Sequence, residues 1–261
     1  MAADLSGTLL AVGLGAARTV PVTWLVPPLG GARLPAAARL AFGLLLAALA
    51  APALAAGASG LEQGGAWLLA VLARELVVGF GLGLVVSFAF RAAETAGRLV
   101  DVLRGASLAE VLVPTSEERA SPLAALYGLL AALVFLELGG VPRLLEALVV
   151  SYRAVPLAAS LPPATLRAAA SVVVVSSARL LEAAVALAAP VIVALWLTDL
   201  ALGMVARVAP QVPVYFVGLP AKGLLAVGVV LLGLGALDHA LAAELPGWLE
   251  LGRRWLAAFT A

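Results

Sequence analysis

Charged residues interrupt almost every apolar stretch of this chain, and this pattern limits how it can fold. Three charge-free runs, residues 76–90, 183–198 and 223–237, contain only 15, 16 and 15 residues. A simple membrane-spanning helix needs about 20 apolar residues. Yet 64% of the 261 residues are hydrophobic and 12% are charged, and the mean hydropathy is +1.12. A soluble domain carries about 25% charged residues. The chain is therefore predicted to be an integral membrane protein whose helices are not simple lipid-facing spans.

Charged residues within or beside the apolar helices need an explanation, because a charge in the bilayer is costly unless it faces protein or water. These residues are Arg18, Arg74, Glu75, Arg179, Glu182, Asp199 and Lys222. For Arg74, Glu75 and Asp199 we favour helix-end side chains that extend to the membrane surface. Arg179 and Glu182 are three residues apart, which places them together on a helix. We predict that these two form a buried or channel-facing intramembrane pair.

Proline and glycine divide the chain into a series of predicted helices within one all-helical unit, residues 1–261. The predicted helices cover residues 9–26, 36–56, 66–104, 122–138, 143–155, 164–208, 214–237 and 247–259. Pro190 predicts a kink in the longest helix. Residues 218–220 are a candidate break in the helix after it.

Two segments carry the membrane signals most directly. The one long charge-free run, residues 40–61, has 22 residues. As a helix it would extend ~33 Å, enough to cross the bilayer once. At the other end, Trp248 and Trp255 lie beside Arg253 and Arg254. This combination predicts a short helix in the membrane interface.

The most charged part of the chain, residues 91–122, lies near its middle. Its first half carries charges of alternating sign spaced 3, 4, 3 and 3 residues apart, which form one stripe on a helix. The stripe consists of Arg91, Glu94, Arg98, Asp101 and Arg104. Gly105 is a natural stop for this helix, and the segment through Pro114 is predicted to be a loop. Ser121 as N-cap and Pro122 as first helical residue predict the start of the next helix.

The predicted loop carries apolar side chains, which a loop in water does not favour. They are Leu108, Val111, Leu112 and Val113. Between Gly105 and Pro114 they could form a seal, because a narrow apolar constriction resists ions by dewetting. The alternative is that they pack the loop against neighbouring helices.

Little in the sequence indicates catalysis or nucleic-acid binding. The net charge is +1, there is no cysteine, and the single histidine, His239, follows Asp238 near a helix end. The glycine-rich residues 79–84 lack a phosphate-loop context, and we expect them to serve close packing or flexibility. Ser171, Ser176 and Ser177 are expected to bond between helices. No cleaved signal peptide is expected, because the amino-terminal segment is not cationic. We predict no catalytic residue, cofactor or metal.

Five segments in order resemble the FliR/SctT family of the flagellar and virulence type III export apparatus. They are PPLGGARLPAAARL (residues 27–40), RELVVGFGLGLVVSF (74–88), ETAGRLVDVLRGASLAEVLVPTSEERASPL (94–123), LVVSYRAVPL (148–157) and DLALGMVARVAPQVPVYFVGLPAKGLL (199–225). Each segment is small and apolar, so their order and spacing carry the resemblance. In the last segment, Arg207, Pro210 and Lys222 are candidate partner contacts.

The resemblance is stronger to the virulence branch than to the flagellar branch. RGAS at residues 104–107, SPL at 121–123 and SY at 151–152 are similar to the virulence pattern. The chain departs from the family at Pro213, where relatives usually have asparagine. It also departs at Val113, where aspartate is common.

The resemblance implies an all-α, polytopic membrane protein of bent helical hairpins with short, charge-interrupted apolar helices. It implies a multi-pass subunit of the bacterial inner membrane, within the secretion basal body, that joins two kinds of sister membrane subunit in an export gate. Residues 105–114 correspond to the loop that plugs the closed pore. Unfolded substrate proteins pass through, and a large export-gate protein and an ATPase complex are further partners. The chain itself would not be an enzyme.

Three other functions remain open at this point. A flagellar export subunit is the main alternative. A small secondary transporter also places charges and broken helices at mid-membrane, but it should show an internal repeat, and we find none. A purely structural scaffold without a conducting role is the third alternative.

Overall fold

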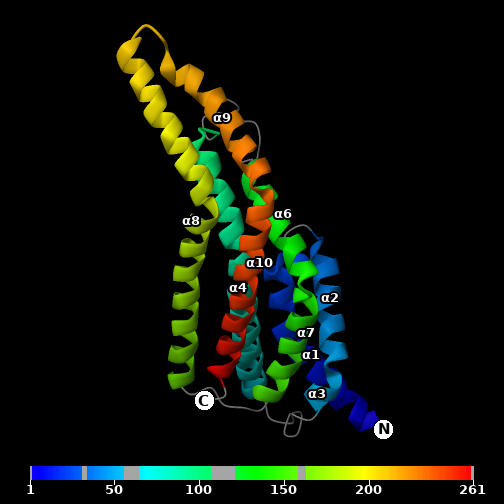
Figure 1. Cartoon of the computed structure of the whole chain (residues 1–261). Coiled ribbons are helices and arrows are strands. Elements are labelled where there is room, and N and C mark those ends of the chain that lie inside the picture. The colour runs from blue at the N-terminus through cyan, green and yellow to red at the C-terminus, as the bar shows by residue number, and fades with distance from the viewer. Residues whose placement is uncertain (1, 31–33, 56–64, 107–120, 158–162, 260–261) are drawn as a thin grey trace. The chain divides into compact units, whose positions relative to one another are not determined.

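The computed structural model describes residues 2–30, 34–55, 65–106, 121–157 and 163–259, and these residues form helices and no β-strand (Figure 1). The helices are α1 (Ala2–Leu25), a 3₁₀ turn (Pro27–Leu29), α2 (Ala36–Leu49), α3 (Ala51–Ala55), α4 (Gly65–Leu103), α6 (Pro122–Glu137), α7 (Gly140–Ala154), α8 (Pro163–Val208), α9 (Val214–Leu232) and α10 (Leu234–Ala257). The predicted all-α fold is confirmed.

Three helices, α4, α8 and α9, are long and apolar enough to cross a membrane. A fourth crossing results if α6 and α7, which bend at their junction, cross as one pair. The helix starts at Pro122 and Val214 were predicted from their prolines and agree with the structure. The chain is a polytopic helical protein.

The predicted crossing by residues 40–61 is wrong. Helix α2 has 14 residues and ends at Leu49, so it is only ~21 Å long. The chain turns at Ala50 before the short helix α3. Pro52 explains the stop, because it has no N–H to donate to the carbonyl one turn earlier. Residues 56–61 of the run lie outside the described residues.

Two predictions for the carboxyl-terminal helices are also wrong. The break falls at Gly233, between α9 and α10, and not at residues 218–220, which continue α9. The expected interfacial helix is the end of α10, and its tryptophans Trp248 and Trp255 are buried. The indole of Trp255 occupies the space beside Gly81, where a Cβ would lie 1.8 Å from the ring, and it donates a hydrogen bond of 3.0 Å to the Val78 carbonyl.

The chain divides into two compact units. We call residues 1–90, 135–178 and 245–261 the first unit, and residues 91–134 and 179–244 the second unit. The boundaries fall within α4, α6, α8 and α10, so each of these helices contributes to both units. The expectation that residues 1–261 act as a single subunit stays a prediction.

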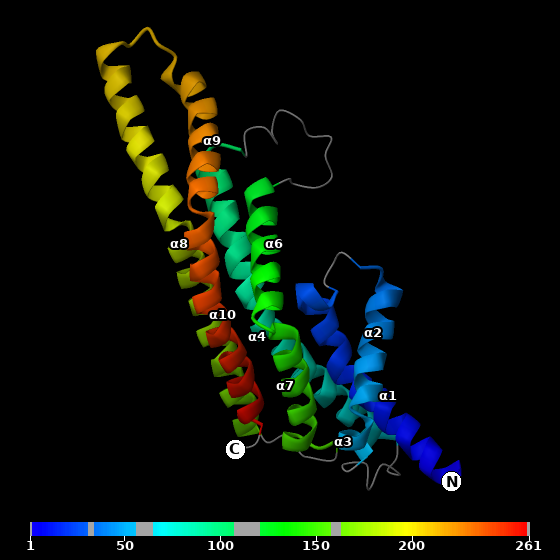
Figure 2. The ribbon, with the colours of Figure 1, turned by 45° about the vertical axis from the view of Figure 1, so that its right-hand side comes forward.

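In the first unit, α1 is the helix on which others pack. Helices α1 and α2 lie side by side in both ribbon views (Figures 1 and 2), and the Thr19 hydroxyl donates a hydrogen bond of 2.7 Å to the Gly43 carbonyl of α2. Helix α4 approaches α1 so closely that a Cβ at Gly79 would lie 2.0 Å from the Arg18 carbonyl oxygen. The expectation that residues 79–84 serve close packing is confirmed at Gly79.

In the second unit, α9 folds back beside the second half of α8. A short turn at residues 209–213 joins the two helices, which lie side by side in both ribbon views (Figures 1 and 2). Lys222 of α9 and Asp199 of α8 form an ion pair of 2.8 Å across this hairpin.

Candidate functional site

The centre of the first unit is an ion pair that is completely buried. The guanidinium group of Arg18 donates two hydrogen bonds to the carboxylate of Glu75, one of 2.7 Å from Nε and one of 3.0 Å from a terminal nitrogen. Both side chains have 0% exposure. This two-point geometry is the strong form of an arginine–carboxylate pair. It joins α1 to α4 in the interior of an apolar unit.

The carboxyl-terminal end of α7 supplies acceptors for the remaining hydrogen-bond donors of Arg18. Arg18 donates to the Ser151 hydroxyl at 3.0 Å and to the Val155 carbonyl at 2.8 Å, and its guanidinium carbon lies 4.4 Å from the centre of the Tyr152 ring. The Tyr152 hydroxyl in turn donates to the Gly15 carbonyl of α1 at 2.8 Å. A buried charge is tolerated when its hydrogen bonds are complete, and here three helices complete them.

This cluster corrects the interpretation of Arg74 and Glu75. We expected helix-end side chains at the membrane surface, whereas Glu75 is fully buried and Arg74 has 6% exposure. Arg74 also donates to Glu75, at 2.6 Å. The missing information was the position of Arg18, since a buried acid needs a buried cation. The cluster joins two of the five segments that carry the family resemblance, residues 74–88 and 148–157.

A second carboxylate organises the second unit. Asp101 near the end of α4 has 4% exposure and accepts hydrogen bonds from both sides of residues 107–120. On one side it binds Arg104 at 2.6 Å. On the other side it accepts from the Ser121 hydroxyl at 2.5 Å and from the Leu123 amide at 3.0 Å. We call this arrangement the Asp101 neck, because it joins the chain where it enters and leaves that segment.

The Asp101 neck confirms two predictions and corrects a third. Helix α6 begins at Pro122, and the Ser121 carbonyl accepts from the Ala125 amide, as expected for an N-cap residue. The backbone amide of Leu123, in the first turn of α6, is however capped by the Asp101 carboxylate of α4. Asp101 was expected on a stripe of alternating charges along the helix; the structure buries it, and there it binds the Leu123 amide as well as Arg104.

The predicted helix stop at Gly105 is confirmed. Gly105 has φ +85°, and the amides of Gly105 and Ala106 donate to the carbonyls of Val102 and Asp101. These two bonds are the pair that ends a helix with a left-handed glycine. The other predicted seal residues, Leu108, Val111, Leu112, Val113 and Pro114, lie outside the described residues.

The predicted pair of Arg179 and Glu182 is not buried by this chain. Arg179 is half-buried and Glu182 is exposed. Arg179 binds Glu244 of α10 at 3.1 Å, a partner that the helical spacing of α8 could not reveal. Residues 179 and 244 are 65 positions apart, so only the fold brings them together.

The candidate partner contacts are at the hairpin of α8 and α9. Arg207 and Pro210 are exposed, and Lys222 is bound to Asp199. Asp199 has 51% side-chain exposure, but it lies nine residues before the end of α8 and pairs with Lys222, so the expected helix-end position is wrong. Within the part of the chain that the structure describes, no group of three acidic or histidine side chains is placed to hold a metal ion.

The fold and its buried charges define a class, a multi-pass helical membrane protein with ion pairs buried between its helices. The profile of the family described as "Bacterial export proteins, family 1" matches residues 9–245, and the chain belongs to this family. The resemblance to the FliR/SctT family is thereby confirmed.

Relatives from both branches of the family are similar to the chain. The surface presentation of antigens protein SpaR of Shigella sonnei is 33% identical over 60% of this chain and 59% of its own length. The Yop proteins translocation protein T of Yersinia pestis is 33% identical over 61% and 60%. The flagellar biosynthetic protein FliR of Escherichia coli is 30% identical over 79% and 76%. The match thus spans about three fifths of the length of the first two relatives.

Breaking the buried pair should destabilise the first unit. Arg18→Gln or Glu75→Gln leaves a buried partner without its full set of bonds, and we expect a loss of about 3–5 kcal/mol. The measurement is the recovery from membranes, and the thermal unfolding, of the chain co-expressed with its membrane-subunit partners. Arg253→Gln is the matched control, because its pair with Glu250 is exposed and 3.9 Å long. Single variants as stable as the wild type would contradict the structural role of the pair.

The two sides of the Asp101 neck should be energetically coupled. In a double-mutant cycle, Asp101→Asn and Ser121→Ala should show a coupling free energy of about 0.5–3 kcal/mol in thermal unfolding. Ser171→Ala is the matched control, because the Ser171 hydroxyl donates to the Ala168 carbonyl of its own helix and not, as expected from the sequence, to another helix. The effects of Asp101→Asn and Ser171→Ala on the free energy of unfolding should be additive. If the effects of Asp101→Asn and Ser121→Ala are also additive, the Asp101 neck does not hold the two ends of residues 107–120 together.

Proposed function

We propose that the chain is a core subunit of a type III export gate in the bacterial inner membrane, and that residues 105–114 help to close its pore. Membership of the bacterial export family supports the general role. The names of SpaR, of the Yop translocation protein and of FliR all refer to surface presentation, translocation or flagellar biosynthesis. No enzymatic step is part of this proposal.

The observation that carries the proposal is the Asp101 neck. A segment that closes a pore must be held at both ends, because free ends would let it leave the pore. Asp101 binds the helix end at Arg104 and the helix start at Ser121 and Leu123. Within this neck the sequence places Leu108 and Val111 to Val113, whose apolar side chains suit a constriction that excludes water.

The surface of α8 supports a role inside a larger assembly. Val174, Leu181, Leu197 and Val208 are each more than 60% exposed, and they extend over residues 174–208 of one helix. That distance is ~51 Å along the helix, whereas the hydrocarbon core is ~30 Å thick. Tilts beyond about 40° are not usual for membrane helices, so lipid alone does not cover this surface. We therefore expect partner subunits to cover the exposed apolar side chains of α8.

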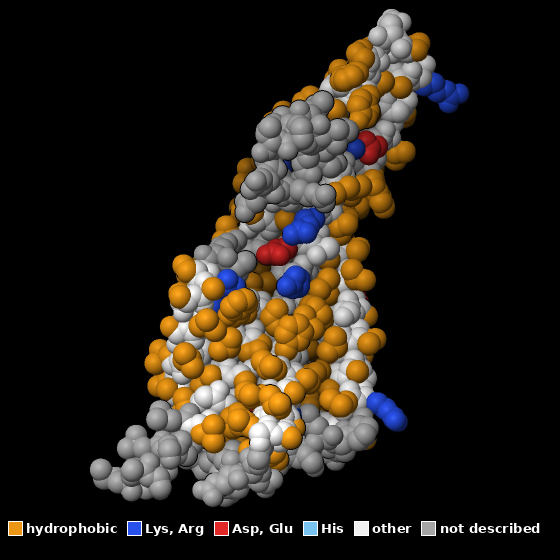
Figure 3. Space-filling view, turned by 180° about the vertical axis from the view of Figure 1, so that it is seen from behind, with side chains coloured by type: hydrophobic (Ala, Val, Ile, Leu, Met, Phe, Trp, Pro, Cys, Tyr) orange, Lys and Arg blue, Asp and Glu red, His pale blue; other side chains and the backbone are white. Residues whose placement is uncertain are grey.

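The ion pair of the hairpin supports the same conclusion. Asp199 and Lys222 lie among exposed apolar side chains such as Trp196 and Leu224, which would favour lipid if no charge were present. Figure 3 shows how apolar side chains cover most of one face of the molecule, with few charges among them. A half-exposed carboxylate is costly in hydrocarbon, so this part of α8 and α9 should face protein or water.

We propose that the partners are the sister membrane subunits, the large export-gate protein with its ATPase complex, and unfolded secreted proteins as substrates. Arg207, Pro210 and Lys222 are the candidate contacts on the hairpin. Arg179 and Glu182, with Glu244, are a polar group that the assembly should bury or place beside the channel.

Between the two branches we favour the virulence type. The RGAS, SPL and SY segments support this choice, and SpaR and the Yop translocation protein are each 33% identical to the chain. A flagellar export subunit is the alternative, supported by the longer match to FliR.

The pore-closing role predicts a leak without a loss of assembly. Replacing residues 108–113 by glycine and serine should leave the gate assembled, because the Asp101 neck stays intact, but should let small ions pass. The measurement is ion leakage in cells that carry the assembled gate, divided by the amount of complex. If the segment only packs against helices, the same change should reduce assembly without raising leakage per complex. An assembled complex that stays sealed would contradict the proposal.

The exposed apolar surface of α8 predicts that the stability of the chain depends on partner subunits. Expressed alone in a membrane, the chain should aggregate or be degraded, and co-expression with the sister subunits should restore it. The measurement is the recovery of monodisperse protein in mild detergent with and without those subunits. A stable, monodisperse chain in the absence of partners would show that lipid covers the apolar surface of α8.

A further inference from the structure

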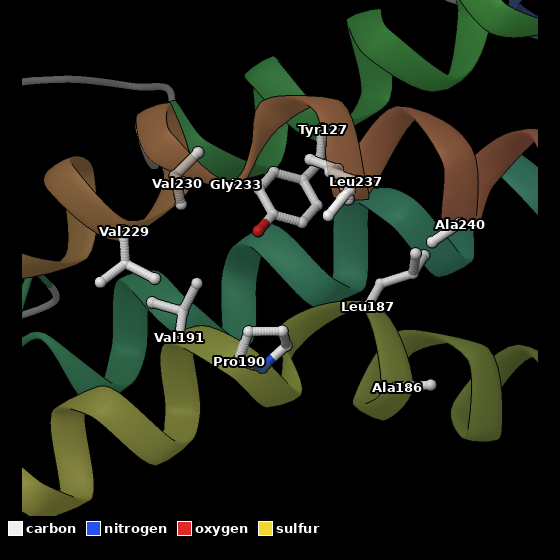
Figure 4. Close-up of a pocket in the computed structure, with 11 residues that line it drawn as sticks. Tyr127, Ala186, Leu187, Pro190, Val191, Val229, Val230, Gly233, Leu237 and Ala240 are labelled. Atoms are coloured by element: carbon white, nitrogen blue, oxygen red, sulfur yellow. The ribbon is translucent and has the colours of Figure 1, made fainter.

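The second unit contains an apolar cavity that none of the roles above uses. Its volume is ≈ 140 Å³, and α6, α8, α9 and α10 line it. Figure 4 shows the side chains around it. Its deeper wall is formed by buried residues such as Leu187, Val191 and Leu237, while Ala186 and Ala240 at its edge are exposed. The cavity is therefore reached from the apolar surface between α8 and α10.

One polar group is directed into this apolar space. Tyr127 of α6 has 2% exposure, and Figure 4 shows its hydroxyl turned toward Pro190 and Val191 across the cavity. Among the residues that the structure describes, this hydroxyl forms no hydrogen bond. The other buried tyrosine, Tyr152, donates to a carbonyl. A hydroxyl that faces an apolar space can donate a hydrogen bond to a bound molecule, so the cavity is suited to a ligand that accepts from Tyr127.

Helix α8 contributes Pro190 to the wall of the cavity, across from Tyr127. Pro190 has no N–H, so the carbonyl of Ala186, four residues earlier, lacks its usual partner in the helix. Both residues line the cavity. A molecule with one hydroxyl can accept a hydrogen bond from Tyr127, while its apolar body contacts the aliphatic wall.

We propose that this cavity binds one small, mostly apolar molecule with a hydroxyl group, of about the size of phenol. A cavity of about 150 Å³ with apolar walls holds one benzene-sized molecule. Water suits the site less well, because a buried water needs two to four polar partners and the wall is mainly aliphatic. The Tyr127 hydroxyl selects the hydroxylated ligand over its plain hydrocarbon.

The test uses 4-fluorophenol and fluorobenzene as probes, followed by ¹⁹F NMR. The full chain is purified with its co-expressed membrane partners in nanodiscs, and empty nanodiscs correct for partition into lipid. The wild type should bind 4-fluorophenol saturably and more tightly than fluorobenzene. Tyr127→Phe removes only the hydroxyl and should weaken 4-fluorophenol binding roughly fivefold to tenfold, with fluorobenzene unchanged.

Two further variants locate the site. Ala240→Phe places a ring at the edge of the cavity and should abolish saturable binding of both probes. Ala201→Phe is its matched control, an exposed alanine of α8 outside the cavity, and should bind like the wild type. Binding that does not saturate, or that Ala240→Phe leaves intact, would overturn the proposed site. Equal binding of the two probes, unaffected by Tyr127→Phe, would overturn the role of the hydroxyl.

Discussion

The first unit depends on an arginine and a glutamate that have no contact with water. Arg18 and Glu75 lie on α1 and α4, and each has 0% exposure. The removal of two charges from water is repaid only when the geometry is close and the remaining hydrogen bonds are complete. Helix α7 completes them through Ser151 and the Val155 carbonyl. The pair therefore decides which faces of three helices meet, and Gly79 lets α1 and α4 approach closely enough for it to form.

Helix α4 carries the decisive carboxylates of both units. Glu75 joins it to α1 and α7 in the first unit, and Asp101 joins it to the start of α6 in the second. The two acids work in the same way, since each is buried and each binds an arginine together with groups from another segment. They differ in what they hold: Glu75 fixes helix faces, whereas Asp101 fixes the two ends of residues 107–120. One continuous helix thus connects the core of the subunit with the segment proposed to close the pore.

Local signals in the sequence predicted the helices well and their contacts poorly. Proline and glycine located the starts of α6 and α9 and the end of α4 at Gly105, because their effect on the backbone does not depend on distant residues. The burial of Glu75 and of Trp248 was missed, because it depends on Arg18 and on the packing of the first unit. The partner of Arg179 was missed for the same reason, since Glu244 lies 65 residues away. The seal residues could be named only from the sequence.

The Arg18–Glu75 pair also suggests a reason for charged residues in such an apolar chain. Replacing a buried ion pair by apolar side chains of similar volume is often neutral or stabilising, so the pair is weak support for a role in stability alone. In a chain that is 64% hydrophobic, however, apolar helices can pack in many registers at similar free energy. A misplaced register would leave Arg18 or Glu75 buried without its partner, which is strongly unfavourable. The charges that make the helices poor lipid-facing spans are thus the ones that can select a single arrangement among them.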